Sequence, residues 1–551
     1  MKNIYRTIVI ISSLLLASCA GDNTPSQPNI IYILADDLGY GELGCYGQEK
    51  IETPSIDRLA ETGIMFTQHY SGAPVCAPSR CILLTGKHSG HAFIRGNHEW
   101  GERGNVWSYR AMIDDPGLEG QYPLPEGTST LGTMLQEQGY KTAIVGKWGL
   151  GAPGSTGVPN KQGFDFFFGY NCQRQAHTYN PVHLWKNEER VFTGNDTVPP
   201  GTKLPEGADP YNEASYSDFW LEVYSPDMMF DEITNFVNEN KDNPFFLYWA
   251  TPIPHLALQA PPEWVKKYVD KFGEEEPYIG DRGYFPNRYP RAAYAAMVSY
   301  LDNQVGELIQ QLKDLGIYDN TLVIFTSDNG PSYTGGTDSH WFNSAGPFSE
   351  DAERVKGRVY EGGIRVPMIA SWPGMIEPGS KTDHISAFWD VMPTLAEITG
   401  AETPDDTDGL SFLPVLTGVN DQEEHDYLYW EFPSYRGQQA VRMGKWKAVR
   451  KDIFNGNMRI ELYDLENDPS ETTDVADSYP EIVAKVDSIM KAAHTPAELD
   501  LFKIKELGDE LEMRDPPSLA WISNPRPSTA DKVRDEPLNV NCKLTILNLK
   551  F

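Results

Sequence analysis

Cysteine, basic residues and long apolar runs are all scarce in this sequence of 551 residues. Six cysteines in so long a chain do not make the disulfide framework of a small secreted protein. The 46 lysines and arginines are outnumbered by 78 aspartates and glutamates, and a formal charge of −32 argues against nucleic acid or an anionic membrane surface as a partner. If the substrate is itself an anion, it must therefore be attracted by positive charge close to the binding site rather than by the net charge of the protein.

The length exceeds what one hydrophobic core usually supports, so we expect one large domain and a smaller one. Hydrophobic residues at 40% and aromatic residues at 12% indicate an ordinary folded protein. The aromatic residues would also suit stacking against sugar rings.

The N-terminus resembles a bacterial lipoprotein signal. Lys2 and Arg6 are followed by an apolar stretch that is too short for an ordinary spanning helix, and then by Leu16-Ala17-Ser18-Cys19. This pattern predicts a signal peptide over residues 1–18, a lipid on Cys19 and a tether over residues 19–28. The protein would be exported to the periplasm or outer membrane and would contact the membrane only through the lipid. A plain cleaved signal peptide is the alternative, and it also implies export.

Continuous apolar runs of strand length recur at residues 29–35, 244–250 and 321–327, with helical patterns between them. Such runs are typical of buried parallel strands, and the alternation indicates an α/β doubly wound sheet over residues 29–424. From residue 425 to 500 the pattern changes to antiparallel strands, which we expect at residues 427–432, 439–450 and 460–465, and then to a helix over 480–493. Residues 501–551 form a tail whose structure the sequence pattern does not predict.

Oxygen-bearing side chains directly follow two of these strands. Asp36 and Asp37 follow the first strand, and Asp328 and Asn329 follow the third. The carboxyl ends of the strands are where open α/β sheets bind ligands, and hard oxygen donors suit calcium or magnesium better than zinc. The sequence therefore predicts a cation site. For Asp36 and Asp37 taken alone, a solvated turn is the alternative.

Residues 74–86 read Pro-Val-Cys-Ala-Pro-Ser-Arg-Cys-Ile-Leu-Leu-Thr-Gly. Pro78 suits the first turn of a helix, so Cys76 would lie at a helix N-terminus, where free N–H groups favour anions. Arg80 would lie one turn later on the same face. This arrangement binds a tetrahedral anion beside a reactive side chain. A helix start with a buried cysteine is the alternative.

Cys76, Pro78, Ser79 and Arg80, followed by Leu-Leu-Thr-Gly, resemble the signature of the formylglycine-dependent (type I) sulfatases of the alkaline phosphatase superfamily. The resemblance spans about residues 29–500. It implies a large mixed, mostly parallel sheet sandwiched by helices, with a smaller C-terminal subdomain of antiparallel sheet and helix. It also implies that a maturation enzyme oxidises Cys76 to formylglycine (3-oxoalanine), whose hydrate is the nucleophile.

The resemblance extends to further residues. It implies that Asp36, Asp37, Asp328 and Asn329 bind Ca²⁺, with Mg²⁺ less favoured. It implies contacts to the sulfate from Arg80, from Lys147 and from Lys356, which lies five residues before Glu-Gly-Gly. His255, after the second apolar run, would protonate the leaving oxygen.

One position departs from the family pattern. The second sulfatase signature normally ends Gly-Lys-Trp-His, but here residue 149 is glycine. The role of that histidine, which is to assist the aldehyde hydrate, must fall to another group or to water.

Residues 151–220 are rich in Gly, Pro, Asn and aromatic residues and indicate long surface loops around the mouth of a pocket. Arg174 and His177 are candidate contacts to substrate hydroxyls. The alternative for each is a loop side chain whose hydrogen bonds go to backbone carbonyls. With the export signal, these loops favour a sulfated carbohydrate as the substrate of a sulfuric ester hydrolase. Two other hypotheses remain: a phosphate or phosphonate ester hydrolase of the same superfamily, and a non-catalytic glycan-binding lipoprotein with an unmodified Cys76.

Overall fold

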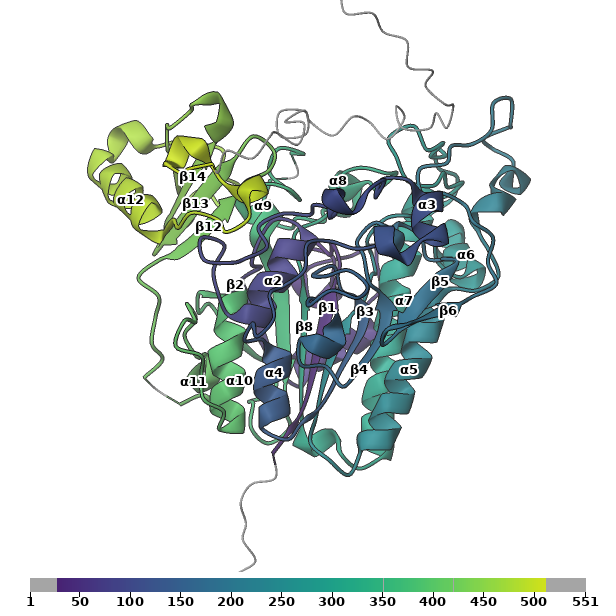
Figure 1. Ribbon diagram of the computed structural model, residues 1–551, viewed down its shortest axis with the longest axis horizontal. Helices are drawn as coiled ribbons and strands as arrows, with labels where there is room; N and C mark the ends of the chain where they lie inside the picture. Colours follow the sequence, from purple (N-terminus) through teal and green to yellow (C-terminus); the bar gives the residue numbers. More distant parts are fainter. Residues whose placement is uncertain (1–26, 350, 420, 512–551) are drawn as a thin grey trace, which may run out of the picture.

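The computed structural model describes residues 27–349, 351–419 and 421–511, and its main feature is one large mixed sheet (Figure 1). The strand order is β10-β2-β9-β8-β1-β7-β3-β4-β5-β6, with β11 paired to β2. The central strands β8, β1, β7, β3 and β4 are parallel, and β9, β5 and β6 add antiparallel pairs. The strands of this sheet are β1 (Asn29–Ala35), β2 (Ile64–Tyr70), β3 (Lys141–Lys147), β4 (Phe166–Tyr170), β5 (His183–Lys186), β6 (Glu189–Phe192), β7 (Phe245–Ala250), β8 (Thr321–Ser327), β9 (Arg365–Ser371), β10 (Ser380–Thr382) and β11 (Ser386–Ala387).

Helices cover both faces of the sheet. The α-helices are α1 (Pro54–Glu61), α2 (Cys76–Thr85), α3 (Tyr109–Asp114), α4 (Leu131–Glu137), α5 (Ser225–Asn240), α6 (Pro262–Phe272), α7 (Pro290–Asp314), α8 (Ser339–Phe342), α9 (Glu361–Ile364), α10 (Val391–Thr399), α11 (Leu413–Thr417) and α12 (Pro480–Ala493). The helices α2, α4 and α10 pack on one face, and α1, α5 and α7 pack on the other. This three-layer arrangement confirms the predicted fold class.

The central strand β1 shows why its sequence is apolar throughout. Ile30, Tyr32 and Leu34 point into the core under α2, α4 and α10, whereas Ile31, Ile33 and Ala35 point into the core under α1, α5 and α7. Successive side chains of a strand face opposite sides, so a strand covered by helices on both sides has no solvent face.

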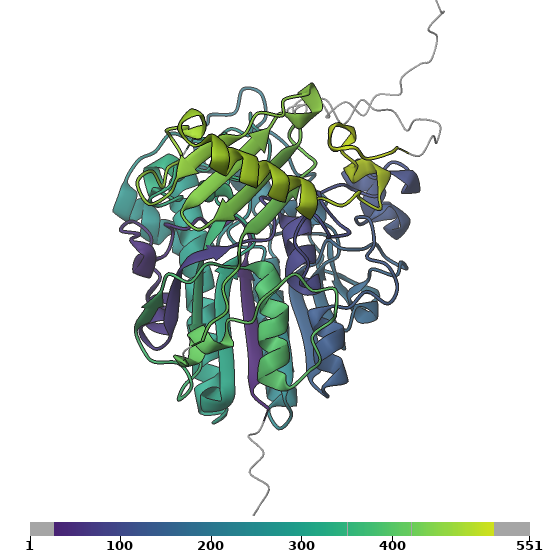
Figure 2. The ribbon, with the colours of Figure 1, turned by 90° about the vertical axis from the view of Figure 1, so that its left-hand side faces the viewer.

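The C-terminal part forms a separate antiparallel sheet with the order β12-β13-β14-β15 and with α12 laid across it (Figure 2). Its strands are β12 (Leu428–Phe432), β13 (Gln438–Met443), β14 (Trp446–Lys451) and β15 (Glu461–Asp464). The prediction of one strand over residues 439–450 is wrong. Gly444 adopts a φ of +54°, which glycine accepts readily, and the chain folds back there into a hairpin.

The prediction that residues 151–220 are surface loops is also wrong in part. This segment contains β4, β5 and β6, which extend the large sheet beyond β3. Phe167 and Phe168 of β4 are buried. The strands are short and two of them are antiparallel, so their signal is weak among the glycines and prolines around them.

Several predictions fall outside the described residues: the signal peptide, the lipid on Cys19, most of the tether and the tail beyond residue 511. The expected limit between residues 424 and 425 lies between α11 and β12. In the part of the chain that the structure describes, no helix is long and apolar enough to cross a membrane. Cys45, Cys76, Cys81 and Cys172 are free thiols there.

Candidate active site

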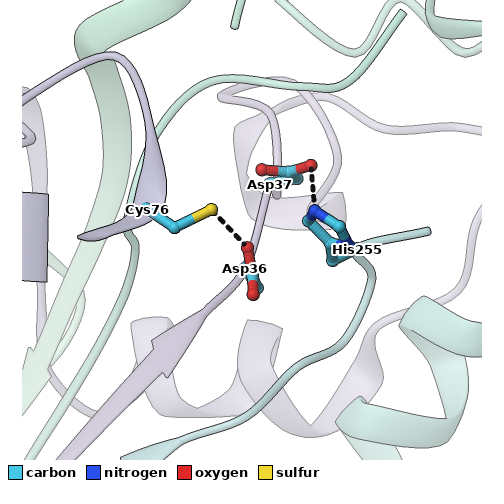
Figure 3. A group of neighbouring side chains, drawn as sticks. All are labelled: Asp36, Asp37, Cys76 and His255. Carbon is cyan, nitrogen blue, oxygen red and sulfur yellow. Dashed lines mark hydrogen bonds and ion pairs between the residues drawn. The ribbon is translucent and has the colours of Figure 1, made fainter. Parts of the chain in front are cut away.

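The predicted site residues lie together at the carboxyl edge of the large sheet. Asp36 and Asp37 follow β1, Lys147 ends β3, His255 follows β7, and Asp328 and Asn329 follow β8. Cys76 is the first residue of α2, as predicted. Figure 3 shows Cys76, Asp36, Asp37 and His255, whose potential ligand atoms all lie within 4.8 Å of one another.

The N-terminus of α2 is held in place by its surroundings. All ten residues of the helix are buried, so the helix packs on every side rather than on one face. Val75, the residue before it, is extended, and the backbone N–H of Ala77 donates to Oδ1 of Asn97 (2.7 Å). One otherwise unsatisfied N–H of the first turn is therefore paired.

Cys76 contacts both an acidic and a basic side chain. Its Sγ lies 3.3 Å from Oδ1 of Asp36 and 3.5 Å from Nζ of Lys147. Lys147 Nζ also donates to Oδ2 of Asp36 (2.6 Å). Burial, with the Asp36 carboxylate, raises the pKa of the Cys76 thiol to about 12, so the unmodified side chain is a neutral thiol.

Arg80 lies behind this pair. Its Nε and one terminal nitrogen donate to Oδ2 of Asp328 (3.0 and 2.8 Å), and its other terminal nitrogen donates to the carbonyl of Lys147 (2.8 Å). The same guanidinium lies 3.4 Å from Oδ2 of Asp36. Arg80 therefore ties the ends of β1, β3 and β8 together and adds a fixed positive charge to the site.

Asp37 adopts a φ of +66°, a conformation that costs a residue with a side chain roughly 1–3 kcal/mol. Neighbouring residues hold it there. Its N–H donates to Oδ1 of Asp328 (3.1 Å), its Oδ1 accepts from Nδ2 of Asn329 (2.8 Å), and its Oδ2 accepts from Nζ of Lys356 (2.5 Å). The strained turn therefore directs the adjacent carboxylates of Asp36 and Asp37 toward the predicted cation site.

These residues fit a hard divalent cation. Oδ1 of Asn329 is buried and has no hydrogen-bond partner among the described residues, which is costly unless a ligand pairs it. Burial and the neighbouring carboxylates raise the pKa of Asp37, and that of Asp328 to about 7, against the opposing effect of Lys356 and Arg80. In formal charge, the carboxylates of Asp36, Asp37 and Asp328 are matched by Arg80, Lys147 and Lys356. Three carboxylates and one amide oxygen form the donor set that calcium prefers.

His255 lies between this cluster and two aromatic side chains. Its Nδ1 bonds to the carbonyl of Leu256 (2.6 Å), and its Nε2 lies 3.7 Å from Oδ2 of Asp37. The ring of His177 stacks on it at 5.2 Å and 15°, and Tyr284 meets it edge-on at 5.9 Å. Burial, together with Lys356 and Lys147, lowers the pKa of His255 well below its usual value.

The two predicted substrate contacts separate in the structure. His177 joins the site through its stacking on His255. Arg174 instead donates to the carbonyl of Val106 (2.6 Å) and lies over the ring of Trp107 at 5.5 Å. Arg174 therefore fits the alternative of a loop residue that bonds to a backbone carbonyl. Both Arg174 and His177 are half-buried.

Tyr284 was not predicted from the sequence. It adopts a φ of +63° and contacts His177 at 5.2 Å, in addition to His255. A lone tyrosine in a loop gives no sequence signal for a site, because its conformation and its neighbours arise only on folding.

Comparison with known proteins agrees with this geometry. The family described as Sulfatase matches residues 28–401, and N-sulphoglucosamine sulphohydrolase, C-terminal, matches residues 355–495. Human arylsulfatase A is 34% identical over 463 residues, which cover 79% of this chain and 77% of that protein. N-acetylgalactosamine-6-O-sulfatase of Bacteroides thetaiotaomicron is 28% identical over 554 residues, which cover 90% of this chain and 100% of that protein.

The fold is also similar to that of a solved sugar complex. The crystal structure of Ps i-CgsB in complex with k-i-k-neocarrahexaose has a TM-score of 0.65 at 26% identity and covers 89% of this chain and 96% of that chain. Since the family match covers more than half of the chain, this protein belongs to the sulfatase family. It is an enzyme of the sulfatase class, which displaces the hypothesis of a non-catalytic glycan-binding protein.

Proposed function

We propose that this sulfatase removes sulfate from a sulfated carbohydrate, with residue 76 as formylglycine and Ca²⁺ as its metal. The observation that carries the proposal is the position of Cys76 Sγ, 3.3 Å from Asp36 and 3.5 Å from Lys147. The residue whose signature marks it for oxidation thus lies against a predicted metal ligand and a cation suited to sulfate.

Two groups would be added to the chain. A separate maturation enzyme, with an external oxidant, converts Cys76; as a hydrated aldehyde, residue 76 supplies two hydroxyls on one carbon, one to attack sulfur and one to expel sulfate. Ca²⁺, held by Asp36, Asp37, Asp328 and Asn329, supplies positive charge toward the sulfate oxygens.

The chain's own cations would hold the sulfate. Lys147 and Lys356 are protonated because their carboxylate partners, Asp36 and Asp37, raise their pKa values against the effect of burial. Both ammonium groups therefore remain charged as negative charge develops on the sulfate oxygens, and neither has to reorganise during the reaction.

His255 is the proposed proton donor to the leaving sugar oxygen. If its Nδ1 donates the bond to the Leu256 carbonyl, its Nε2 is left to exchange a proton with the substrate. The two lysines that lower its pKa are the same groups that the sulfate neutralises. Binding of the anionic substrate therefore favours the protonated imidazole that acid catalysis requires.

A carbohydrate substrate is supported by relatives rather than by the motifs. One relative that covers 90% of this chain is named for a sulfated amino sugar, and one structural neighbour was solved in complex with k-i-k-neocarrahexaose. The aromatic and imidazole rings of Tyr284 and His177 beside His255 also suit contact with a sugar.

The proposal is tested by producing the protein together with a formylglycine-generating enzyme. Mass spectrometry of the peptide that contains Cys76 measures conversion, and turnover is then measured on defined sulfated monosaccharides and disaccharides, 4-nitrophenyl sulfate and 4-nitrophenyl phosphate. We expect turnover of one or more sulfated sugars. A large preference for the phosphate ester would favour the phosphate or phosphonate hydrolase, and full conversion without turnover of any sulfate ester would refute the proposal.

We also propose export as a lipoprotein anchored at Cys19, on the basis of the N-terminal pattern. Metabolic labelling with a radioactive fatty acid in the native host is expected to mark the wild-type protein but not Cys19→Ser. An unlabelled wild-type protein in the soluble exported fraction would favour a plain cleaved signal.

A further inference from the structure

The glycine at residue 149 makes room for another side chain. Gly149 lies two residues beyond Lys147 and has a φ of +83°. A Cβ at this position would lie 2.1 Å from Nε2 and 2.9 Å from Cδ of Gln173. The amide of Gln173 therefore fills the space that any side chain at residue 149 would need.

The backbone fixes this arrangement. The N–H of Trp148 donates to the carbonyl of Tyr170 (3.0 Å), and the N–H of Gly149 donates to the carbonyl of Asn171 (3.1 Å), so the chain beyond β3 remains paired with the chain beyond β4. The N–H of Gln173 donates to Oε1 of Gln121 (3.1 Å). Gln173 is thus anchored through its main chain, whereas its side-chain amide has no such bond to the described residues.

The amide of Gln173 is polar, buried and unpaired. The residue is only 5% exposed, and neither Oε1 nor Nε2 has a hydrogen-bond partner among the described residues. Burial of an unpaired amide is unfavourable, and a water molecule or a bound ligand can supply the missing partner. In this respect Gln173 resembles Asn329, whose unpaired oxygen lies at the predicted cation site. Gln173 differs from the other unpaired amides in its contact with Gly149, two residues beyond Lys147.

We infer that Gln173 is a substrate-binding residue, whose amide N–H donates to an oxygen of the sulfate ester held by Lys147. The inference rests on the proposed function and extends it, because it assigns a group to the position where this chain lacks the histidine of the second signature. The amide is neutral, so it adds a directed hydrogen bond to the charge that Lys147 supplies.

The first test compares Gln173→Leu with Gln175→Leu. Gln175 is the control because it is also buried and lies two residues away, but its Nε2 is paired with the His183 carbonyl (2.8 Å) and only its Oε1 lacks a partner among the described residues. With 4-nitrophenyl sulfate, we expect Gln173→Leu to lower kcat/KM by about 10-fold to 100-fold, as for loss of one donor to a developing oxyanion. Inorganic sulfate should also inhibit it about 10-fold less tightly, as expected for one lost hydrogen bond to a charged group.

The inhibition constant separates binding from folding. A variant that folds poorly has fewer active molecules and a lower kcat, but its inhibition constant for sulfate does not change. Gln175→Leu should therefore leave the inhibition constant at the wild-type value whatever its effect on stability. An unchanged inhibition constant and an unchanged kcat/KM in Gln173→Leu would overturn the inference.

A double-mutant cycle supplies the second test. Gly149→Ala pushes the amide out of its place, so Gly149→Ala and Gln173→Ala should remove the same interaction. The double variant should lose no more kcat/KM than the more impaired single variant. Losses that multiply would count against the inference. If the fully converted wild-type enzyme turns over no sulfate ester, the proposed function itself fails, which is a different result.

Discussion

The side chains of Asp37 and Asn329 are hydrogen-bonded at 2.8 Å although 292 residues separate them in the sequence. This bond uses the amide nitrogen of Asn329 and leaves its oxygen without a partner among the described residues. The two strand ends therefore meet with a free oxygen ligand between them.

Asn329→Ala is expected to weaken Ca²⁺ binding at least about 10-fold, by analogy with the loss of groups that support a metal site. Isothermal titration of chelator-treated protein measures the affinity, and Asn238→Ala on the exposed side of α5 is the control. In the wild type, Ca²⁺ at about 100 times its Kd should add roughly 2.7 kcal/mol to the free energy of unfolding. An identical affinity in Asn329→Ala would exclude this residue as a ligand.

Lys147→Ala is expected to lower kcat/KM for 4-nitrophenyl sulfate by about 100-fold to 1,000-fold, the usual loss for one group that stabilises developing charge. The residue at the other end of the same strand, Lys141, is exposed and provides the control. Lys141→Ala should retain wild-type kinetics. Equal kinetics in the two variants would show that Lys147 does not act on the sulfate.

His255→Ala should affect poor leaving groups most. We expect a loss of about 100-fold to 10,000-fold in kcat on a sulfated sugar, the range for general acid catalysis. The loss should be much smaller on 4-nitrophenyl sulfate, whose phenolate leaves without a proton. His340→Ala, at an exposed position, is the control. A loss of the same size on both substrates would contradict the assignment of an acid.

His177 can be tested by two substitutions. His177→Phe keeps a ring against His255, whereas His177→Ala removes it. If His177 binds a substrate hydroxyl, both variants should lose activity on sulfated sugars by about 10-fold and retain turnover of 4-nitrophenyl sulfate. Recovery in His177→Phe alone would instead show that the ring positions His255. Unchanged sugar kinetics in both variants would remove His177 from the site.

His494 predicts a pH-dependent stability. It lies at the end of α12 and bonds to Glu431 (2.7 Å) and Asp509 (2.9 Å). Burial disfavours its charged form, but these two carboxylates raise its pKa overall. Its contribution is therefore complete below the unfolded-state pKa of about 6.5 and is lost as the pH rises through the higher folded-state value.

We expect His494→Ala to lower the Tm more at pH 5.5 than at pH 9. At the lower pH, two buried carboxylates would lose a charged donor, which costs roughly 1–3 kcal/mol. Thermal unfolding of wild type and variant at both pH values gives the comparison. A Tm difference that is the same at both pH values would show that the protonated form contributes nothing.

Much of the fold is encoded in local patterns. The strands β1 and β8 and the helix α12 have the predicted bounds. The two strands are apolar runs of strand length, and the helix has the length and periodic apolar pattern of a helix. The strands β4 to β6 were missed, because short strands near the end of a sheet depend on partners elsewhere in the chain.

The sequence by itself determined the chemical inventory of the site: a cysteine at a helix start and acidic or basic side chains at strand ends. Parallel strands bring their carboxyl ends to one edge of the sheet, and the strand order β8-β1-β7-β3 makes the ends that carry these residues neighbours. The stacking of His177 on His255, the contact of Tyr284 and the place of Gln173 over Gly149 were decided only by the tertiary structure. They come from loops, whose paths depend on packing between distant segments and leave no periodic trace in the sequence.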